Sequence, residues 1–113
     1  MKSDEVFLKH ILDEVEFVLK GTSGITFEEF ITDDVLTRAC TRSLEITGEA
    51  VKNLSPSIRK RHKSIDWTKI AGLRDRLIHG YFDISYDLVW ETVIRDLPPL
   101  IVKLDKVLAE ERV

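Results

Sequence analysis

The sequence DDVLTRACTRSLEITGEAVKNLSP, which runs from Asp33 to Pro56, decides the fold. Its small and apolar residues recur at three- and four-residue steps, the spacing that places side chains on one face of a helix. These residues are Leu36, Ala39, Cys40, Leu44, Thr47, Ala50, Val51 and Leu54. The residue before a proline disfavours helical geometry, so Ser55-Pro56 stops the pattern. We therefore predict a long amphipathic helix from about Asp33 to Leu54.

Apolar residues at three- and four-residue steps also occur before the long helix. Near the N-terminus one helical face carries Phe7, Leu8, Ile11, Leu12, Val15, Val18 and Leu19. Ser3 or Asp4 can cap the start of that helix, because a side-chain oxygen there accepts from a free backbone N–H group. In TFEEF, Thr26 and Glu29 stand three residues apart, which is the spacing of a capping box. We therefore predict a helix before Gly21 and a further helical turn after Thr26.

A basic connector follows the long helix. It reads PSIRKRHKSID and has room for one helical turn. Asp66 can cap the next helix, WTKIAGLRDRLIH over residues 67–79, and Gly80 can end it. This segment contains most of the charged and polar residues that are candidates for a functional site.

Two further helices complete the predicted fold. Asp83 or Ser85 can open the first of them. Asp96 can cap the second, with Pro98 and Pro99 in its first turn, where backbone N–H groups have no intrahelical partner in any case. No alternating strand pattern, Asn-Gly hairpin or internal repeat is present. We therefore predict an all-α fold, a mostly antiparallel bundle of four to five helices in one domain over residues 1–113.

The bulk composition excludes several classes of protein. The chain has 113 residues, of which 43% are hydrophobic and 33% charged, and its net charge is −3. No apolar run approaches the roughly 20 residues of a membrane helix. The start, MKSDEVFLKH, lacks the basic region and apolar block of a signal peptide, so we expect a cytoplasmic protein without membrane contact. The negative charge argues against strong non-specific nucleic-acid binding, so RNA contact requires a local basic patch or a specific site.

Metal and cofactor sites are not indicated. The three histidines, His10, His62 and His79, are far apart, and no Cys pair or His-Glu-x-x-His pattern occurs, so we expect no metal. No Gly-rich phosphate loop is present, which argues against nucleotide binding by the chain alone. The single cysteine, Cys40, lies in the apolar stripe of the long helix and is expected in the core rather than as a nucleophile.

The densest positive patch is the run Arg59, Lys60, Arg61 and Lys63, with His62 inside it. It is either a solvated connector or a contact to the phosphate backbone of RNA. The two interpretations differ in salt dependence, because only phosphate contacts release counterions on binding.

Gly48 is unusual because it lies in the middle of the predicted long helix. Glycine there costs about 1 kcal/mol relative to alanine, and close approach of a neighbouring helix would justify that cost. Glu45 and Glu49 are then candidates to meet a cation across the contact. Arg74 or Arg76 is the obvious cation, whereas surface ion pairs within one helix are the alternative interpretation.

The stretch LRDRLIHGYFDI, from Leu73 to Ile84, places charged and polar residues within an apolar frame. An arginine can hold phosphate oxygens and a histidine can transfer a proton near neutral pH, which is the chemistry of metal-free RNA cleavage. Arg74 and His79 are five residues apart, however, and on one continuous helix they point about 140° away from each other. They converge only if the helix ends at His79-Gly80 or if a second subunit supplies one of them. The alternative is a histidine that compensates the dipole at a helix C-terminus.

These segments resemble a known family. IAGLRDRLIHGYF is similar to the signature of HepT-like proteins, which are small helical domains of the HEPN superfamily. RSLEITGEA, the entry into the motif helix at Trp67 to Ile70, Trp90, and DLPPL before the last helix also fit, so the resemblance covers almost the whole chain. Thr47 stands where an apolar residue is expected, which is a mild departure.

The resemblance implies a dimeric helical bundle and a metal-independent ribonuclease toxin of a toxin–antitoxin module. By the R-x4-H-x-Y pattern of the family, Arg74 and His79 are the catalytic pair. Tyr81 is the residue to which a cognate MntA-like nucleotidyltransferase transfers AMP from ATP, which silences the toxin. ATP is then used by the partner, and this chain itself needs no cofactor. Supporting roles around the site, as orienting or charge-pairing residues, fall to Asp75, Arg76, Glu45 and Glu49.

A second hypothesis remains from the sequence. The chain can instead be a non-catalytic helical partner that docks or regulates a nucleotidyltransferase, and its acidic net charge of −3 favours this modestly. Only the ribonuclease hypothesis predicts growth arrest when the chain is expressed without its partner.

Overall fold

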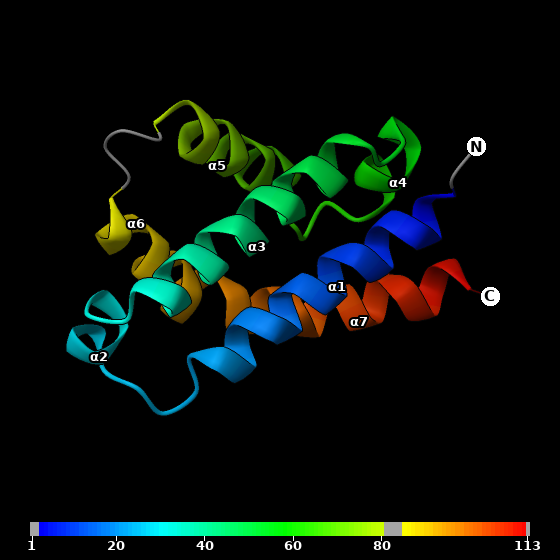
Figure 1. Cartoon of the computed structure of the whole chain (residues 1–113). Helices are drawn as coiled ribbons and strands as arrows, with labels where there is room; N and C mark the ends of the chain where they lie inside the picture. Colours follow the sequence, from blue (N-terminus) through cyan, green and yellow to red (C-terminus); the bar gives the residue numbers. More distant parts are fainter. Residues whose placement is uncertain (1–2, 81–84, 113) are drawn as a thin grey trace.

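The computed structural model describes residues 3–80 and 85–112, which form helices joined by short connections and contain no strand (Figure 1). In chain order the elements are α1 (Asp4–Gly21), α2 (Phe27–Ile31), α3 (Asp34–Lys52), α4 (Pro56–Arg61), α5 (Trp67–His79), α6 (Tyr86–Glu91), the π-helical turn η1 (Thr92–Asp96) and α7 (Leu97–Glu111). The predicted all-α bundle is confirmed. None of the described helices is long and apolar enough to cross a membrane.

The long helix α3 lies at the centre of the bundle. It packs against α1 on one side and α5 on the other, and α7 packs against α1. Successive long helices run in opposite directions along the chain (Figure 1). The predicted stripes form the core, in which the most buried side chains include Leu8, Ile11, Val15, Phe30, Cys40, Val51, Val89 and Leu104. Thr47 is also buried there, because its hydroxyl donates to the Ser43 carbonyl 2.8 Å away and is thereby satisfied.

Helix α5 is the least enclosed of the long helices. Only Trp67 and Leu77 of its residues are buried. The other apolar side chains of α5 that contact the core, including Ile70 and Leu73, are only partly buried. The motif segment therefore lies on an outer helix with much of its surface open, a position that suits a binding element better than a core element.

The predicted caps mostly hold. Thr26 and Glu29 make both bonds of the capping box, and Asp66 and Ser85 each accept from a backbone N–H of the helix that follows. The alternative opening at Asp83 lies outside the described residues. Ser3 is at the N-cap position of α1 but makes no side-chain cap bond there.

Helix α7 starts at Leu97 as predicted, with Asp96 at the N-cap position and a proline in the first turn, but no break in the helix precedes it. The chain stays helical from Tyr86 to Glu111 through the π turn η1, in which the Leu97 N–H donates to the Thr92 carbonyl five residues back. Asp96 makes no cap bond. Pro98 and Pro99 bring no N–H donors to the helix, and the wider turn before them accommodates their rings without a break.

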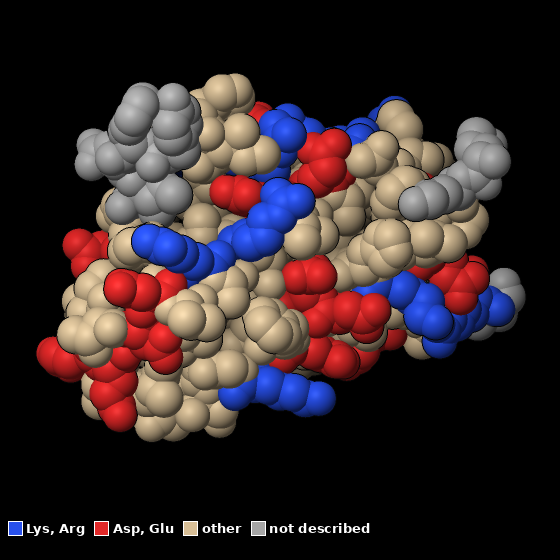
Figure 2. All heavy atoms as spheres, in the orientation of Figure 1, with Lys and Arg blue, Asp and Glu red and all other residues tan. Residues whose placement is uncertain are grey.

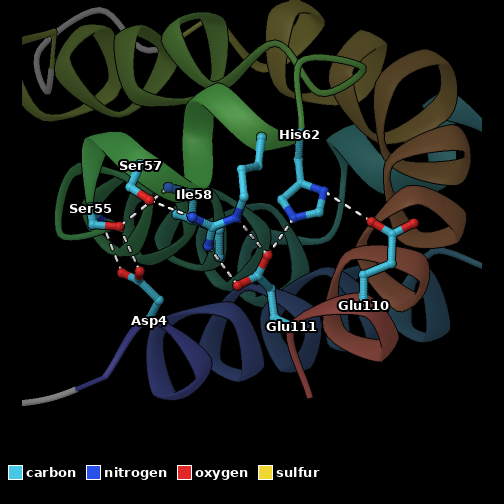
Figure 3. Close-up of polar contacts among 8 residues, drawn as sticks. Asp4, Ser55, Ser57, Ile58, His62, Glu110 and Glu111 are labelled. Atoms are coloured by element: carbon cyan, nitrogen blue, oxygen red, sulfur yellow. Dashed lines mark hydrogen bonds and ion pairs between the residues drawn. The ribbon is translucent and has the colours of Figure 1, made fainter. Parts of the chain in front are cut away.

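A clamp joins α4 to both ends of the chain (Figure 3). Asp4 accepts from the Ser55 N–H at 2.9 Å and the Ser55 hydroxyl at 2.6 Å instead of capping α1. Glu111 on α7 holds the Arg61 guanidinium through two bonds, of 2.7 and 3.2 Å, and lies 2.7 Å from Nε2 of His62. The hydrogen bond from Arg61, and then that from His62, lowers the pKa of Glu111. The basic connector is thus fixed in place rather than loosely solvated.

Candidate functional site

Helix α5 positions the motif residues. Its start is set by Asp66, whose carboxylate accepts from the Lys69 N–H at 3.0 Å, and its last residue is His79. The Gly80 N–H donates to the Arg76 carbonyl at 3.0 Å. A Cβ atom at Gly80 would lie 2.8 Å from that carbonyl oxygen, so glycine suits this helix end. Tyr81 lies outside the described residues.

Gly48 marks the closest approach of α3 and α5. A Cβ atom there would lie 2.2 Å from Cβ of Arg74 and 3.0 Å from the Ile70 carbonyl oxygen. The predicted reason for a mid-helix glycine is confirmed, because any side chain would force the two helices apart. The side chain of Arg74 therefore packs directly on the backbone of α3 at Gly48.

We predict opposite effects for two mid-helix glycines. Gly48→Ala should lower the free energy of unfolding by about 1–3 kcal/mol, because overpacking outweighs the gain of about 1 kcal/mol in helix propensity. Gly72→Ala is the matched control, since a Cβ atom there meets nothing within 4 Å and only the propensity gain remains. Urea denaturation of both variants measures the difference. Stabilisation by Gly48→Ala would contradict the close contact.

Two carboxylates hold the Arg74 guanidinium. Its Nε lies 3.1 Å from Oε2 of Glu49 on α3, in an ion-pair contact without hydrogen-bond alignment. Its Nη1 donates to Oδ1 of Asp75 at 3.0 Å. The contact between Glu49 and Arg74 is the one predicted across Gly48. The side chain of Arg74 is 24% exposed, so the guanidinium is oriented while part of it remains accessible.

Asp75 joins Arg74 to a second cation. The Lys52 Nζ at the end of α3 donates to Asp75 Oδ1 at 2.5 Å. The hydrogen bond from Lys52, and then that from Arg74, lowers the pKa of Asp75, so the carboxylate stays charged and able to hold Arg74. Sequence reasoning missed Lys52, since nothing local marks it as a partner of a residue 23 positions away.

His79 is exposed, and one of its ring nitrogens is fixed. Nδ1 lies 2.9 Å from the Asp75 carbonyl oxygen, and because that oxygen can only accept, Nδ1 carries the proton. In the neutral ring, Nε2 then has a free lone pair. Nε2 of His79 is therefore the proton acceptor, because Nδ1 is bonded to the helix backbone.

Arg74 and His79 do not converge within one chain. Arg74 lies against α3, where it lines a hollow of about 290 Å³ between α1, α3 and α5. Ile78 lines that hollow and His79 does not. The helix does end at His79, as one alternative required, yet α5 is helical through both residues and keeps them about 140° apart. The end of the helix alone therefore does not assemble the pair.

The hollow beside Arg74, which we call the Arg74 hollow, contains residues that the sequence did not single out. Its lining comprises Phe7, His10, Arg42, Glu45, Ile46, Glu49, Ala50, Asn53, Arg74 and Ile78. Glu45 pairs with Arg42 at 3.1 Å within α3, so the predicted contact of Glu45 with a cation on α5 does not form. Only the packing of α1 on α3 brings His10 beside Arg74.

Arg76 lies on a different side of α5. It lines an apolar groove of about 550 Å³ between α5 and the segment α6 to α7, with Leu73, Leu88 and Leu97 among the lining residues. It is exposed and has no ion pair with a described residue. Asp75 lines the same groove, so Arg76 lies near that carboxylate but does not take part in its ion pairs with Arg74 and Lys52.

The basic run divides into two parts. Arg61 is occupied by Glu111 and Ser57, so it is not free to hold a phosphate. Arg59, Lys60 and Lys63 instead line an open hollow, described below. Arg61 is therefore less available to a phosphate than the other cations of the run, because the C-terminal helix supplies a carboxylate 50 residues along the chain.

Cys40 is fully buried. Burial, and then the charge of Asp33, raises the pKa of its thiol to about 11. A neutral, enclosed thiol is a poor nucleophile, in accord with the expected core position. Within the described residues no three His, Cys, Asp or Glu side chains are grouped as metal ligands are.

Comparison with known proteins identifies relatives over nearly the full chain. The sequence model described as "Ribonuclease HepT-like" matches residues 11–107. A protein of Caldanaerobacter subterraneus subsp. tengcongensis named "Putative RNase" is 47% identical over 112 residues, which cover 99% of this chain and 100% of the relative. A protein of Thermococcus cleftensis named "Probable ribonuclease HepT" is 37% identical over 93% of this chain and 96% of its own. No solved structure matches significantly.

Proposed function

Because this chain belongs to the HepT-like family of ribonucleases, we propose that it is the toxin of a toxin–antitoxin pair and cuts RNA without a metal ion. The observation that carries the proposal is the family match over residues 11–107, which includes the whole of α5 and its Arg74 and His79. The toxin acts in the cytoplasm, where its RNA substrate is found. It uses no cofactor of its own.

The chemistry follows from the groups that α5 presents. His79 Nε2 takes the proton of a ribose 2′-hydroxyl, and the oxygen attacks the adjacent phosphorus. The bond to the 5′-oxygen of the next nucleotide breaks, and that oxygen takes a proton from water while the protonated His79 ring returns its proton to water. The products are a 2′,3′-cyclic phosphate and a 5′-hydroxyl. Arg74 stabilises the negative charge that gathers on the phosphorane oxygens. Glu49 and Asp75 orient its guanidinium for that task, and Lys52 keeps Asp75 in place.

A second copy of the chain completes the site in this proposal. Arg74 and His79 point about 140° apart on one α5, so a single phosphate cannot meet both within one chain. In a symmetric dimer with two α5 helices facing each other, Arg74 of one copy and the partner's histidine can approach the same phosphate. Isologous contacts of this kind produce two equivalent sites.

Two measurements test the ribonuclease proposal. Purified wild-type chain should cut single-stranded RNA in the presence of EDTA and produce cyclic phosphate ends. Expression without an antitoxin should arrest bacterial growth. The separation of Arg74 from His79 within one chain favours a second candidate, a non-catalytic partner of a nucleotidyltransferase. Neither cleavage nor arrest is expected in that case, and their joint absence would replace the first proposal with the second.

We further propose that the antitoxin is a minimal nucleotidyltransferase of the MntA type and that Tyr81 is its target. The phenol oxygen attacks the α-phosphorus of ATP, pyrophosphate leaves and the phenol proton is lost. The chain then carries AMP two residues after His79. The resemblance of HGY, residues 79–81, to the family pattern supports this assignment. An added phosphate and nucleoside beside His79 would repel and obstruct RNA.

Tyr81→Phe should escape the antitoxin. The variant should still arrest growth when the nucleotidyltransferase is co-expressed, because it lacks the acceptor oxygen. Tyr86→Phe is the matched control, as it removes the other tyrosine of the chain and should be neutralised like the wild type. Mass spectrometry of the purified proteins measures the AMP adduct. An adduct that persists on Tyr81→Phe at the wild-type level would remove Tyr81 as the main acceptor.

A further inference from the structure

The open hollow beside α4 gathers cations that have no acidic partner. We call it the α4 hollow; it has a volume of about 530 Å³ and is lined by Pro56, Arg59, Lys60, Lys63, Ser64, Ile65, Asp66, Trp67 and Thr68. Arg59, Lys60 and Lys63 form no ion pair with any described residue, although most arginines of the described chain do. Nε of Arg59 is buried without a hydrogen-bond partner. The one carboxylate in the lining, Asp66, already accepts from the Lys69 N–H.

The clamp keeps these cations in place. Arg61, between Lys60 and Lys63 in sequence, is tied to Glu111 on α7, and Ser55 at the start of α4 is tied to Asp4 (Figure 3). A fixed α4 presents its free cations at little entropic cost when a ligand arrives. By contrast, acidic side chains gather over α2 at the opposite end of α3, at the lower left of Figure 2. A polyanion is therefore attracted to the α4 end of the bundle.

One face of α5 connects the α4 hollow to the motif. Thr68, Gly72, Asp75 and His79 follow four- and three-residue steps and lie within about 60° of one another around the helix. Thr68 lines the α4 hollow and His79 ends the helix. Gly72 between them has no side chain, and nothing lies within 4 Å of where its Cβ would be. Asp75, between Gly72 and His79 on this face, is bonded to Lys52 and Arg74, and these two cations offset the charge of its carboxylate.

We infer that the α4 hollow binds backbone phosphates of the RNA substrate, upstream or downstream of the cut, on a strand that runs along this face of α5. The inference rests on the proposed ribonuclease function. From Thr68 to His79 the helix rises about 17 Å. A strand must span that distance to contact both the α4 hollow and His79, so a very short oligonucleotide cannot fill both places. Phosphate contacts of this kind add affinity without reading sequence.

Binding of RNA that cannot be cut tests the inference independently of catalysis. Single-stranded 2′-O-methyl RNAs of about 4 and about 12 nucleotides lack the attacking hydroxyl, and fluorescence anisotropy in EDTA reports their affinity. The triple variant Arg59→Gln, Lys60→Gln, Lys63→Gln should bind the longer RNA about tenfold or more weakly near 0.15 M salt. Its slope of log K against log salt should fall by about 2, at about 0.7 for each lost phosphate contact. The wild type should bind the shorter RNA more weakly than the longer one, because the shorter RNA cannot reach the α4 hollow and His79 together.

The chain offers a charge-matched control. Lys20→Gln, Arg38→Gln, Lys106→Gln removes one arginine and two lysines that are exposed and have no ion pair with a described residue. This control should keep the wild-type slope. Because Arg59 is partly buried, the double variant Lys60→Gln, Lys63→Gln guards against misfolding, and its slope should fall by about 1.4.

Four results would overturn the inference. The first is an unchanged slope in both hollow variants, and the second is an equal loss in the control, which would indicate a general charge effect. The third is an equal affinity of the wild type for the short and long RNAs. A failure of the ribonuclease proposal appears separately, as a wild-type protein that binds the longer RNA but does not cut the unmodified strand. The fourth result against the inference is preferential binding of an acidic peptide over RNA at the α4 hollow.

Discussion

Replacement of His79 by alanine should reduce RNA cleavage by about 10²–10⁴-fold, the range expected when a general base is lost. The side chain is exposed, and its Nδ1 donates to the Asp75 carbonyl at 2.9 Å. Thermal unfolding should therefore differ little from the wild type, so that the loss reflects chemistry. Initial rates on a fluorescent RNA in EDTA measure the change.

A second variant and a rescue experiment distinguish proton transfer by His79 from a structural role. His79→Gln can keep a bond to the Asp75 carbonyl through its side-chain amide but cannot accept a proton from RNA, so it should be as inactive as the alanine variant. Imidazole in solution should restore part of the activity of His79→Ala, because it can enter the space and act as the base. Wild-type rates for His79→Gln would exclude His79 as the base.

Replacement of Arg74 by alanine should reduce cleavage by about 10²–10³-fold, as when a donor to the transition-state charge is removed. Because Arg74 also joins Glu49 to Asp75, the variant leaves two carboxylates without one partner and should be slightly less stable. Arg76→Ala is the matched control. It removes an equal charge from the same helix, but on the side of the apolar groove, and should retain most of the activity.

Mixing the two inactive variants tests whether the site is shared between copies. If Arg74 of one chain acts with the histidine of another, exchange of subunits between Arg74→Ala and His79→Ala creates a complete pair. Random exchange should restore about a quarter of wild-type activity, because half of the dimers are mixed and each has one intact site of two. A mixture that remains inactive after subunit exchange, shown by exchange of fluorescent labels, would contradict the shared site.

Several features of the site were predictable from local patterns. The three- and four-residue spacing located the long helices, and the caps at Thr26, Asp66 and Ser85 needed only neighbours a few positions away. Gly48 was the most informative residue, because its cost within a helix implied a close neighbour, and Arg74 is that neighbour. The start of α7 after Asp96 was predicted, but the π turn that joins it to α6 was not, since a proline pattern does not show whether the residues before it are also helical.

The sequence by itself determined the helices, because their apolar spacing and caps are local. It also indicated a close neighbour at Gly48 and membership in a ribonuclease family, which rests on residues 11–107 together. Only the tertiary structure decided which charges are free. Lys52 reaches Asp75 across 23 residues and Glu111 occupies Arg61 across 50, and no local pattern specifies such pairs. The opposite directions of Arg74 and His79 on α5, by contrast, follow from their five-residue spacing on one helix. Which partner each side chain meets depends on what packs against its helix, and that is set by contacts far apart in the chain.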